Sequence, residues 1–179
     1  MLSACTVGMV PRDLPPPEPA TEVPGTTSTE ASTDASTTPA AAPVRYELDG
    51  NRLALPGPIV FTGEALDAAS DPALEHARGY LVAKDVITLM RIEGHADDQA
   101  QSERRALTVA RWLIAHGIDC KRLIAVGFGP TKPIADTGTL EGRAQNTRIE
   151  LHNAQMRGKA IGGMPADGGG QLAAADLCQ

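Results

Sequence analysis

The distribution of apolar and polar residues divides the chain into two parts. Residues 6–45 are dominated by Pro, Thr, Ser, Ala and Glu and contain almost nothing that could form a core. Such a segment cannot offset its ordering entropy by burying apolar surface, so we expect a disordered, partly polyproline-like linker. From Tyr46 onward, apolar residues recur at the spacings of strands and helices. Folded structure is therefore expected to begin there.

Local signals predict the first elements of this folded part. Asp49-Gly50, between alternating apolar residues, is typical of a hairpin turn. Ser70-Asp71-Pro72 favours a helix start, because Pro is tolerated in the first helical turn and Ser or Asp can cap it. The apolar stripe of this helix would consist of Leu74, Ala77, Leu81 and Val82.

Further along the chain, strand and helix patterns alternate. Residues 86–93 are apolar on both faces, as in a central strand, and Gly117 fits the position just after a helix. The remaining elements are expected at 59–61 (strand), 86–93 (strand), Ser102–Gly117 (helix), 123–128 (strand), Thr139–Gln145 (helix, capped by Thr139) and 147–152 (strand). The order β-α-β-α-β-α-β favours an α+β sandwich with helices packed on a mixed sheet, preceded by the disordered tether. The domain should occupy residues 46–155, and the Gly-rich residues 156–179 should form a loosely packed tail.

Composition and charge narrow the class of protein. The formal net charge is −6, and Lys and Arg do not cluster. Because binding to phosphate backbones needs a concentrated basic surface, we expect no nucleic-acid partner. Aromatic residues make up 3% of the chain, so the core should consist of Ala, Val, Ile and Leu. No apolar run approaches the roughly 20 residues of a membrane-spanning helix.

The N-terminal residues 1–5 carry a possible processing signal. Leu2-Ser3-Ala4-Cys5 resembles a bacterial lipobox, in which the cysteine is acylated and becomes the mature N-terminus. The basic and apolar regions of an export signal do not precede it, so we expect a true start upstream of Met1. In that case Cys5 holds a membrane and the linker provides reach; the alternative is an accidental match.

Cys120 and Cys178 are the other two cysteines. In an oxidising envelope they could form a disulfide that ties the tail to the domain. The alternative is a pair of unpaired thiols, one buried and one near a frayed end. The sequence leaves both open.

Six motifs follow one another in a fixed order in the second part of the chain. They are Ile59-Val60-Phe61, Ile92-Glu93-Gly94-His95-Ala96-Asp97, Ser102-Glu103-Arg104-Arg105-Ala106, Gly127-Phe128-Gly129, Pro133-Ile134-Ala135 and Thr139-Leu140-Glu141-Gly142-Arg143-Ala144-Gln145-Asn146. Over roughly residues 52–152 this series resembles the OmpA-like C-terminal domain, the peptidoglycan-binding module also found in peptidoglycan-associated lipoproteins. The resemblance implies an OmpA-C-like βαβαβ(α)β fold and a peptidoglycan-binding function.

The resemblance also implies specific ligand contacts. Asp97 would bind the amino group, and Arg105 the carboxylate, of the diaminopimelate in the peptide stem; two such contacts fix orientation as well as charge. Asp98 is a second candidate, because the loop between Asp97 and Ser102 is shorter than in the family pattern. No catalytic residue, metal or cofactor is expected. These features imply an envelope lipoprotein on the periplasmic face of the outer membrane, holding that membrane to the cell wall.

Other interpretations stay open at this stage. The same fold with a weakened pocket could act mainly as a protein interaction module of a Tol–Pal type system. Asp97 could instead cap the following helix and form a surface ion pair with Arg105. His95, Asp97 and Asp98 also resemble part of a metal-ligand cluster, which makes a metal-dependent hydrolase a remote alternative. A metal site needs three or more converging ligands, and the spacing of the other histidines does not demand convergence.

Overall fold

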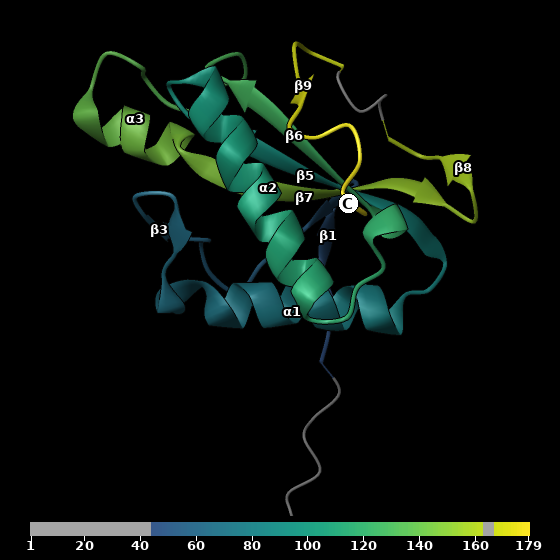
Figure 1. Cartoon of the computed structure of the whole chain (residues 1–179). Helices are drawn as coiled ribbons and strands as arrows, with labels where there is room; N and C mark the ends of the chain where they lie inside the picture. Colours follow the sequence, from purple (N-terminus) through teal and green to yellow (C-terminus); the bar gives the residue numbers. More distant parts are fainter. Residues whose placement is uncertain (1–43, 163–166) are drawn as a thin grey trace, which may run out of the picture. The chain divides into compact units, whose positions relative to one another are not determined.

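The computed structural model describes residues 44–162 and 167–179, which form a mixed β-sheet with helices packed on one face (Figure 1). The strand order is β1-β2-β7-β5-β6-β9, and β8 pairs with β7 off this path. β5 and β6 are parallel, whereas the other neighbouring pairs are antiparallel. This arrangement confirms the predicted α+β class with helices on a mixed sheet.

The elements follow one another closely along the chain. The strands are β1 (Leu48–Asp49), β2 (Arg52–Leu53), β3 (Phe61–Thr62), β4 (Ala65–Leu66), β5 (Ile87–His95), β6 (Leu123–Gly129), β7 (Arg148–Met156), β8 (Lys159–Ala160) and β9 (Gln171–Leu172). The helices are α1 (Asp71–Ala83), α2 (Gln99–Ala115) and α3 (Leu140–Asn146), with short 3-10 turns η1 (Ala68–Ser70) and η2 (Cys120–Arg122). β3 and β4 pair only with each other, in a separate two-stranded hairpin.

The core lies between the sheet and the helices α1 and α2. Alternate residues of the central strands point toward the helices and are fully buried, as Met90 and Ile92 show. Leu81 of α1 and Leu113 of α2 pack in the same cluster. The predicted stripe of α1 is confirmed at Leu74, Ala77 and Leu81. It is wrong at Val82, which is largely exposed because one step along a helix turns the side chain away from the core.

Two glycines let α2 lie directly on the central strands. A Cβ at Gly94 of β5 would be 2.0 Å from the backbone oxygen of Ser102. A Cβ at Gly127 of β6 would be 2.5 Å from Cγ of Glu103. The side-chain hydroxyl of Ser102 then accepts a hydrogen bond from the backbone N–H of Gly129 (2.9 Å). The glycines of the predicted motifs are therefore the places where helix and sheet make contact.

The first turns of both long helices differ from prediction. Ser70 does precede α1, but its side chain does not cap the helix; it hydrogen-bonds the backbone N–H and C=O of Val60 instead. α2 begins at Gln99 rather than at Ser102, and Asp98 caps it through the backbone N–H of Gln101 (2.7 Å). The expectation that Asp97 caps this helix is wrong. The C-terminal end agrees with prediction, because Gly117 adopts a φ of +90° just beyond α2.

Strand boundaries also shift. The strand expected at 59–61 is wrong in extent, because β3 begins only at Phe61 and Val60 is bound to Ser70. β5 and β7 both run further than predicted, to His95 and Met156. The Asp49-Gly50 hairpin is confirmed, with Gly50 at a φ of +60°.

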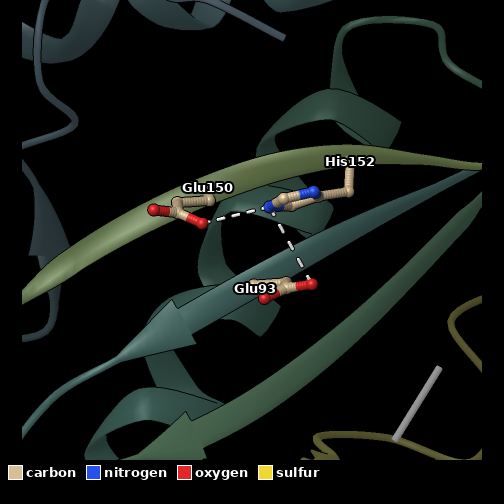
Figure 2. Close-up of side chains that lie close together, drawn as sticks. All are labelled: Glu93, Glu150 and His152. Atoms are coloured by element: carbon tan, nitrogen blue, oxygen red, sulfur yellow. Dashed lines mark hydrogen bonds and ion pairs between the residues drawn. The ribbon is translucent and has the colours of Figure 1, made fainter. Parts of the chain in front are cut away.

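The sheet face opposite the helices carries charged side chains. Glu93 of β5 lies across from Glu150 of β7, and His152 is one alternation further along β7. The three side chains point toward one another on this face (Figure 2). The charged groups are therefore gathered by strand pairing, not by proximity in sequence.

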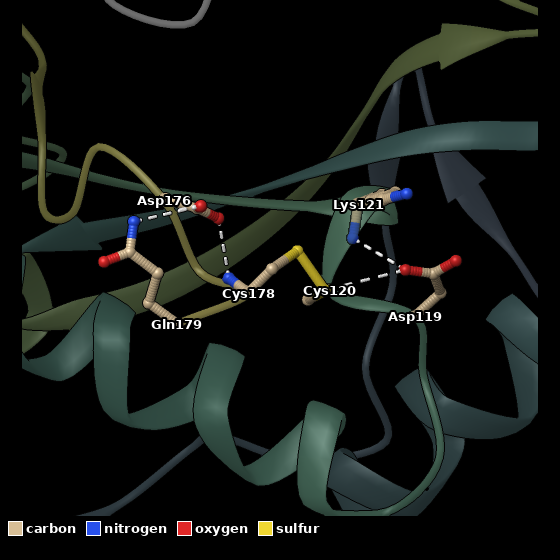
Figure 3. Close-up of a disulfide and its surroundings, with 6 residues drawn as sticks. All are labelled: Asp119, Cys120, Lys121, Asp176, Cys178 and Gln179. Carbon is tan, nitrogen blue, oxygen red and sulfur yellow. Dashed lines mark hydrogen bonds between the residues drawn. A yellow bond between two sulfur atoms is a disulfide. The ribbon is translucent and has the colours of Figure 1, made fainter.

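The C-terminal residues are attached to the sheet, so the expected loose tail is wrong for this part. β9 pairs with β6 and forms an edge of the sheet, and Ala173 and Leu177 pack against the core. Cys178 forms a disulfide with Cys120 of η2, and its backbone N–H donates to Asp176 (Figure 3). Of the two alternatives for these cysteines, the structure has the bridge.

The predicted linker at 6–45 and the lipobox with Cys5 lie almost entirely outside the described residues. Within the described ranges, none of the helices has the length and apolar character needed to span a membrane.

Candidate functional site

A cleft of about 420 Å³ lies where the 58–61 segment, α2 and the α3–β7 junction meet. Its lining residues are Pro58, Ile59, Val60, Phe61, Arg105, Ala144, Thr147 and Arg148. The walls are mainly apolar, and two guanidinium groups supply the charge. Such a combination suits a small ligand that carries an anionic group.

Of the two guanidinium groups, that of Arg105 makes fewer hydrogen bonds to the protein. Its Cζ lies 5.0 Å from the ring centroid of Phe61, and its Nη2 donates a long contact of 3.5 Å to the carbonyl of Gly63. Its Nε is buried without a hydrogen-bond partner. Burial lowers the pKa of Arg105 from its usual value, and the charge of Glu64 opposes that shift. Arg105 therefore keeps donors that a bound carboxylate could accept.

Arg148 is fixed by its neighbours. Its Nε donates to Glu150 (2.8 Å), and its Nη atoms donate to the carbonyls of Lys132 and Asn146 at 3.2–3.3 Å. These contacts hold the guanidinium in place and give the cleft a second positive charge. Arg148 was not among the ligand residues predicted from the sequence. Its place two residues after Asn146, at the start of the last strand, was the available signal.

Asp97 lies at a different hollow from Arg105. It is 57% exposed, and its Oδ2 is 3.7 Å from Nε of Arg143. The hollow beside it is lined by Gly129, Asn146 and residues of the 130–137 loop. The expected surface pair of Asp97 with Arg105 is therefore wrong in its partner. The two hollows adjoin the same helix, since Ala144 lines one and Asn146 the other.

Asn146 organises this end of the domain. Its Oδ1 accepts hydrogen bonds from the backbone N–H groups of Ile134 and Ala135, and its Nδ2 donates to the carbonyl of Ala135. The last residue of the Thr139–Asn146 motif thus fixes the loop between β6 and α3. Asp98, the second ligand candidate, is engaged as the cap of α2.

A second polar group lies on the open face of the sheet. Within the described residues, Glu93, Glu150 and His152 are the group whose possible ligand atoms all fall within 4.8 Å of one another. Among the described residues, the set of His95, Asp97 and Asp98, weighed as a remote alternative, is not such a group. The proximity of Glu93 to Glu150 and His152 becomes visible only when β5 and β7 are paired, because these residues are far apart in the sequence.

The two carboxyls of this group are held ionised. Burial raises the pKa of Glu93, but His95, His152, Arg91 and Lys132 together outweigh it and lower the pKa to about 2. For Glu150, the hydrogen bond from His152 is the largest cause of a lowered pKa, burial opposes it, and Arg148 adds to the lowering. Both glutamates are therefore anionic at neutral pH.

The fold and the cleft together define a small α+β module with a basic, ligand-sized cleft at one end. A model of the OmpA family matches residues 61–147, a stretch that begins in β3, ends just after α3 and includes both long helices. The chain thus carries an OmpA family domain, which confirms the resemblance drawn from the motifs.

Individual relatives match over shorter stretches. "Probable lipoprotein YiaD" from Escherichia coli is 45% identical over 58 residues, covering 32% of this chain and 26% of that protein. "Peptidoglycan-binding protein ArfA" from Mycobacterium bovis is 44% identical over 50 residues, covering 28% of this chain and 15% of that protein. The chain thus matches about a quarter or less of the length of these curated relatives.

Among solved structures, the periplasmic domain of Helicobacter pylori MotB has the same fold. The TM-score is 0.50 at 20% sequence identity, over 60% of this chain and 78% of that one.

Proposed function

We propose that this chain is a non-catalytic, peptidoglycan-binding envelope lipoprotein that tethers the outer membrane to the cell wall. Two findings support the proposal: the OmpA family domain at residues 61–147, and a relative named as a peptidoglycan-binding protein. The single observation that carries it is the state of Arg105. This guanidinium lines a ligand-sized cleft, and its Nε has no hydrogen-bond partner.

In the proposed complex, Arg105 binds a carboxylate of the diaminopimelate stem peptide. Phe61 supports the guanidinium plane, and Arg148 adds positive charge. Asp97 binds the amino group of the same residue from the neighbouring hollow, and Arg143 is the group it exchanges for the ligand. An exposed pair such as Asp97–Arg143 contributes about 0–1 kcal/mol, so a ligand ammonium can replace it.

Binding to purified peptidoglycan sacculi tests this proposal. Arg105→Ala and Asp97→Ala should each reduce the bound fraction strongly, since each removes one of two charged contacts. Arg104→Ala is the matched control, because the neighbouring arginine is on the same helix but pairs with Glu64 outside the cleft. Circular dichroism checks that every variant is folded.

The outcomes separate the proposal from its rival. If Arg104→Ala weakens binding as much as Arg105→Ala, general charge rather than the cleft is responsible. If the wild-type protein does not bind sacculi, the protein interaction module of a Tol–Pal type system becomes the better interpretation. Sacculus binding that neither Arg105→Ala nor Asp97→Ala affects would move the site elsewhere.

Lipid attachment at Cys5 is the second part of the proposal, and the relative named as a probable lipoprotein supports it. Stable anchoring needs more than one acyl chain, which a lipobox cysteine would receive. Expressed behind a lipoprotein export signal, the chain should incorporate radioactive palmitate and fractionate with the outer membrane. Cys5→Ser should abolish labelling, whereas Cys120→Ser should retain it; label that persists without Cys5 contradicts the anchor.

A further inference from the structure

The open face of the sheet gathers two carboxylates and two imidazoles. Glu93 and His95 come from β5, and Glu150 and His152 come from the antiparallel neighbour β7. His152 Nε2 is 3.0 Å from Glu150 Oε2 and 3.9 Å from Glu93 Oε1 (Figure 2). His95 Nε2 is 3.6 Å from Glu93 Oε2 and 4.0 Å from Glu150 Oε2. Both rings thus direct the same nitrogen toward the same two carboxylates.

The buried side chain of His95 has unsatisfied hydrogen-bonding capacity, which points to a bound partner in this group. The residue is 1% exposed, yet neither of its ring nitrogens has a hydrogen-bond partner. Its ring stacks on Phe128, with centroids 5.5 Å apart, which holds the plane in place. An unsatisfied polar nitrogen in the protein interior is unfavourable. A cation between the imidazole and the carboxylates would give Nε2, the nitrogen nearest to Glu93 and Glu150, a partner.

The carboxylates are oriented as metal ligands usually are. Arg91 binds Oε1 of Glu93, and Arg148 binds Oε1 of Glu150 (2.8 Å). Oε2 of Glu93 is left directed toward His95, and Oε2 of Glu150 toward His152. Hydrogen bonds to the outer oxygen of a ligating carboxylate are a common support of metal sites.

We propose that Glu93, His95, Glu150 and His152 bind a zinc-class divalent ion on the sheet face opposite the helices. Imidazole nitrogen with carboxylate oxygen suits Zn²⁺ and its transition-metal neighbours rather than Mg²⁺ or Ca²⁺. Bond lengths of about 2.0–2.2 Å in a tetrahedron place ligand atoms roughly 3.3–3.6 Å apart. The histidine–carboxylate separations of 3.0–4.0 Å are close to these values. Glu93, Glu150 and His152 already lie within 4.8 Å of one another, whereas His95 is outside that group and would have to shift toward it to become the fourth ligand.

Solvent can reach the site from one side. The side chains of Glu150 and His152 are 15% and 21% exposed, whereas Glu93 is 3% exposed. An ion could therefore enter from the β7 side and be held against the buried Glu93. This proposal does not depend on peptidoglycan binding, because none of the four proposed ligands lines the cleft. Arg148 is the residue that the two sites share, since it lines the cleft and binds Glu150.

Lys132 is the competing cation. Its Nζ is 3.5 Å from Glu93 Oε2 and 3.6 Å from the centroid of the Phe128 ring, and its side chain is 36% exposed. A flexible lysine can withdraw into solvent when a metal binds. Removing its charge should therefore tighten metal binding, which is a response that adventitious surface binding would not show.

Titration of the full chain with zinc sulfate tests the proposal. The chain is stripped with chelator and carries Cys5→Ser, which removes the thiol that the Cys120–Cys178 disulfide leaves over. Isothermal calorimetry gives stoichiometry and affinity, and the absorption spectrum with Co²⁺ reports tetrahedral nitrogen and oxygen ligands. We expect one ion per chain.

The variants decide the outcome. Glu93→Gln and His152→Ala should each weaken zinc binding by about tenfold or more, and Lys132→Gln should strengthen it. His116→Ala is the control, because His116 stacks on Trp112 at the far end of α2. His152, whose side chain is 21% exposed, keeps the test valid if Glu93→Gln fails to fold. No stoichiometric zinc, or binding that neither Glu93→Gln nor His152→Ala weakens, overturns the proposal.

Discussion

Two adjacent arginines on α2 show how strongly position decides the role of a side chain. Arg104 points to solvent and pairs with Glu64, whereas Arg105 lies over Phe61 at the cleft. Successive helical residues are rotated by about 100°, so a single step separates a surface ion pair from a side chain that lines the cleft. Residue identity alone would not distinguish them.

Gly94 is where a single added methyl group should be most harmful. In Gly94→Ala the new Cβ would be 2.0 Å from the carbonyl oxygen of Ser102, and a backbone atom cannot rotate away. We expect a loss of about 3 kcal/mol in the free energy of unfolding, at the upper end for overpacking. Urea denaturation of the full chain measures it.

Gly57→Ala is the matched control, because nothing lies within 4 Å of a Cβ there. It should leave the free energy of unfolding nearly unchanged. Equal stability of the two variants would show that α2 does not depend on close approach at Gly94.

At the residue scale, the sequence predicted the motif positions but not what each carboxylate contacts. Asp97 and Asp98 are chemically alike and adjacent, so no pattern could show that Asp98 caps α2 while Asp97 faces Arg143. The proximity of Glu93 and Glu150 could not be predicted from the sequence for another reason. Their proximity depends on the register between β5 and β7, which involves residues far apart in the chain.

The start of α2 is the element most affected by the short loop after β5. Only Ala96, Asp97 and Asp98 separate β5 from α2. Asp98 is therefore both the last residue of the loop and the N-cap of the helix. Helical periodicity was visible from Ser102, whereas the three residues before it carry no apolar signal. Long, periodic elements were predicted correctly, and their ends were not, because caps depend on hydrogen bonds.

Asp98→Ala should therefore destabilise α2 by about 1 kcal/mol, the usual cost of losing an N-cap. Asp97→Ala should change stability less, because its pair with Arg143 is exposed. Thermal denaturation gives the stability of both variants, and sacculus binding should rank them in the opposite order. A larger stability loss in Asp97→Ala would contradict this assignment of the cap.

At the scale of the whole domain, the Cys120–Cys178 disulfide holds the C-terminal segment and the edge strand β9 against β6. β9 has only two residues, so its pairing is weak without this bond. The expected loose tail was inferred from glycine content, and composition does not record a covalent bond. The pairing of the two cysteines could be suggested but not decided from the sequence.

Cys178→Ser should lower the free energy of unfolding by about 2–4 kcal/mol, since the bond closes a loop with a sequence separation of 58. The measurement is urea denaturation with and without dithiothreitol. Cys5→Ser serves as the control and should remain sensitive to the reductant, whereas Cys178→Ser should not. Wild-type protein whose unfolding ignores the reductant would contradict a stabilising role for the bond.

In the proposed tether, load would pass through the β1–β2 hairpin on its way from the N-terminal side of the domain to the cleft. Short backbone pairing holds the hairpin at Leu48–Leu53, Asp49–Arg52 and Arg52–His152, and the buried side chain of Leu53 packs in the core. Tension entering at Val44 would peel these contacts open one after another, and residues 46–55 would lengthen by up to about 3.3 Å each. The hairpin would then open and lengthen at a lower load than the one that deforms the 58–61 wall of the cleft.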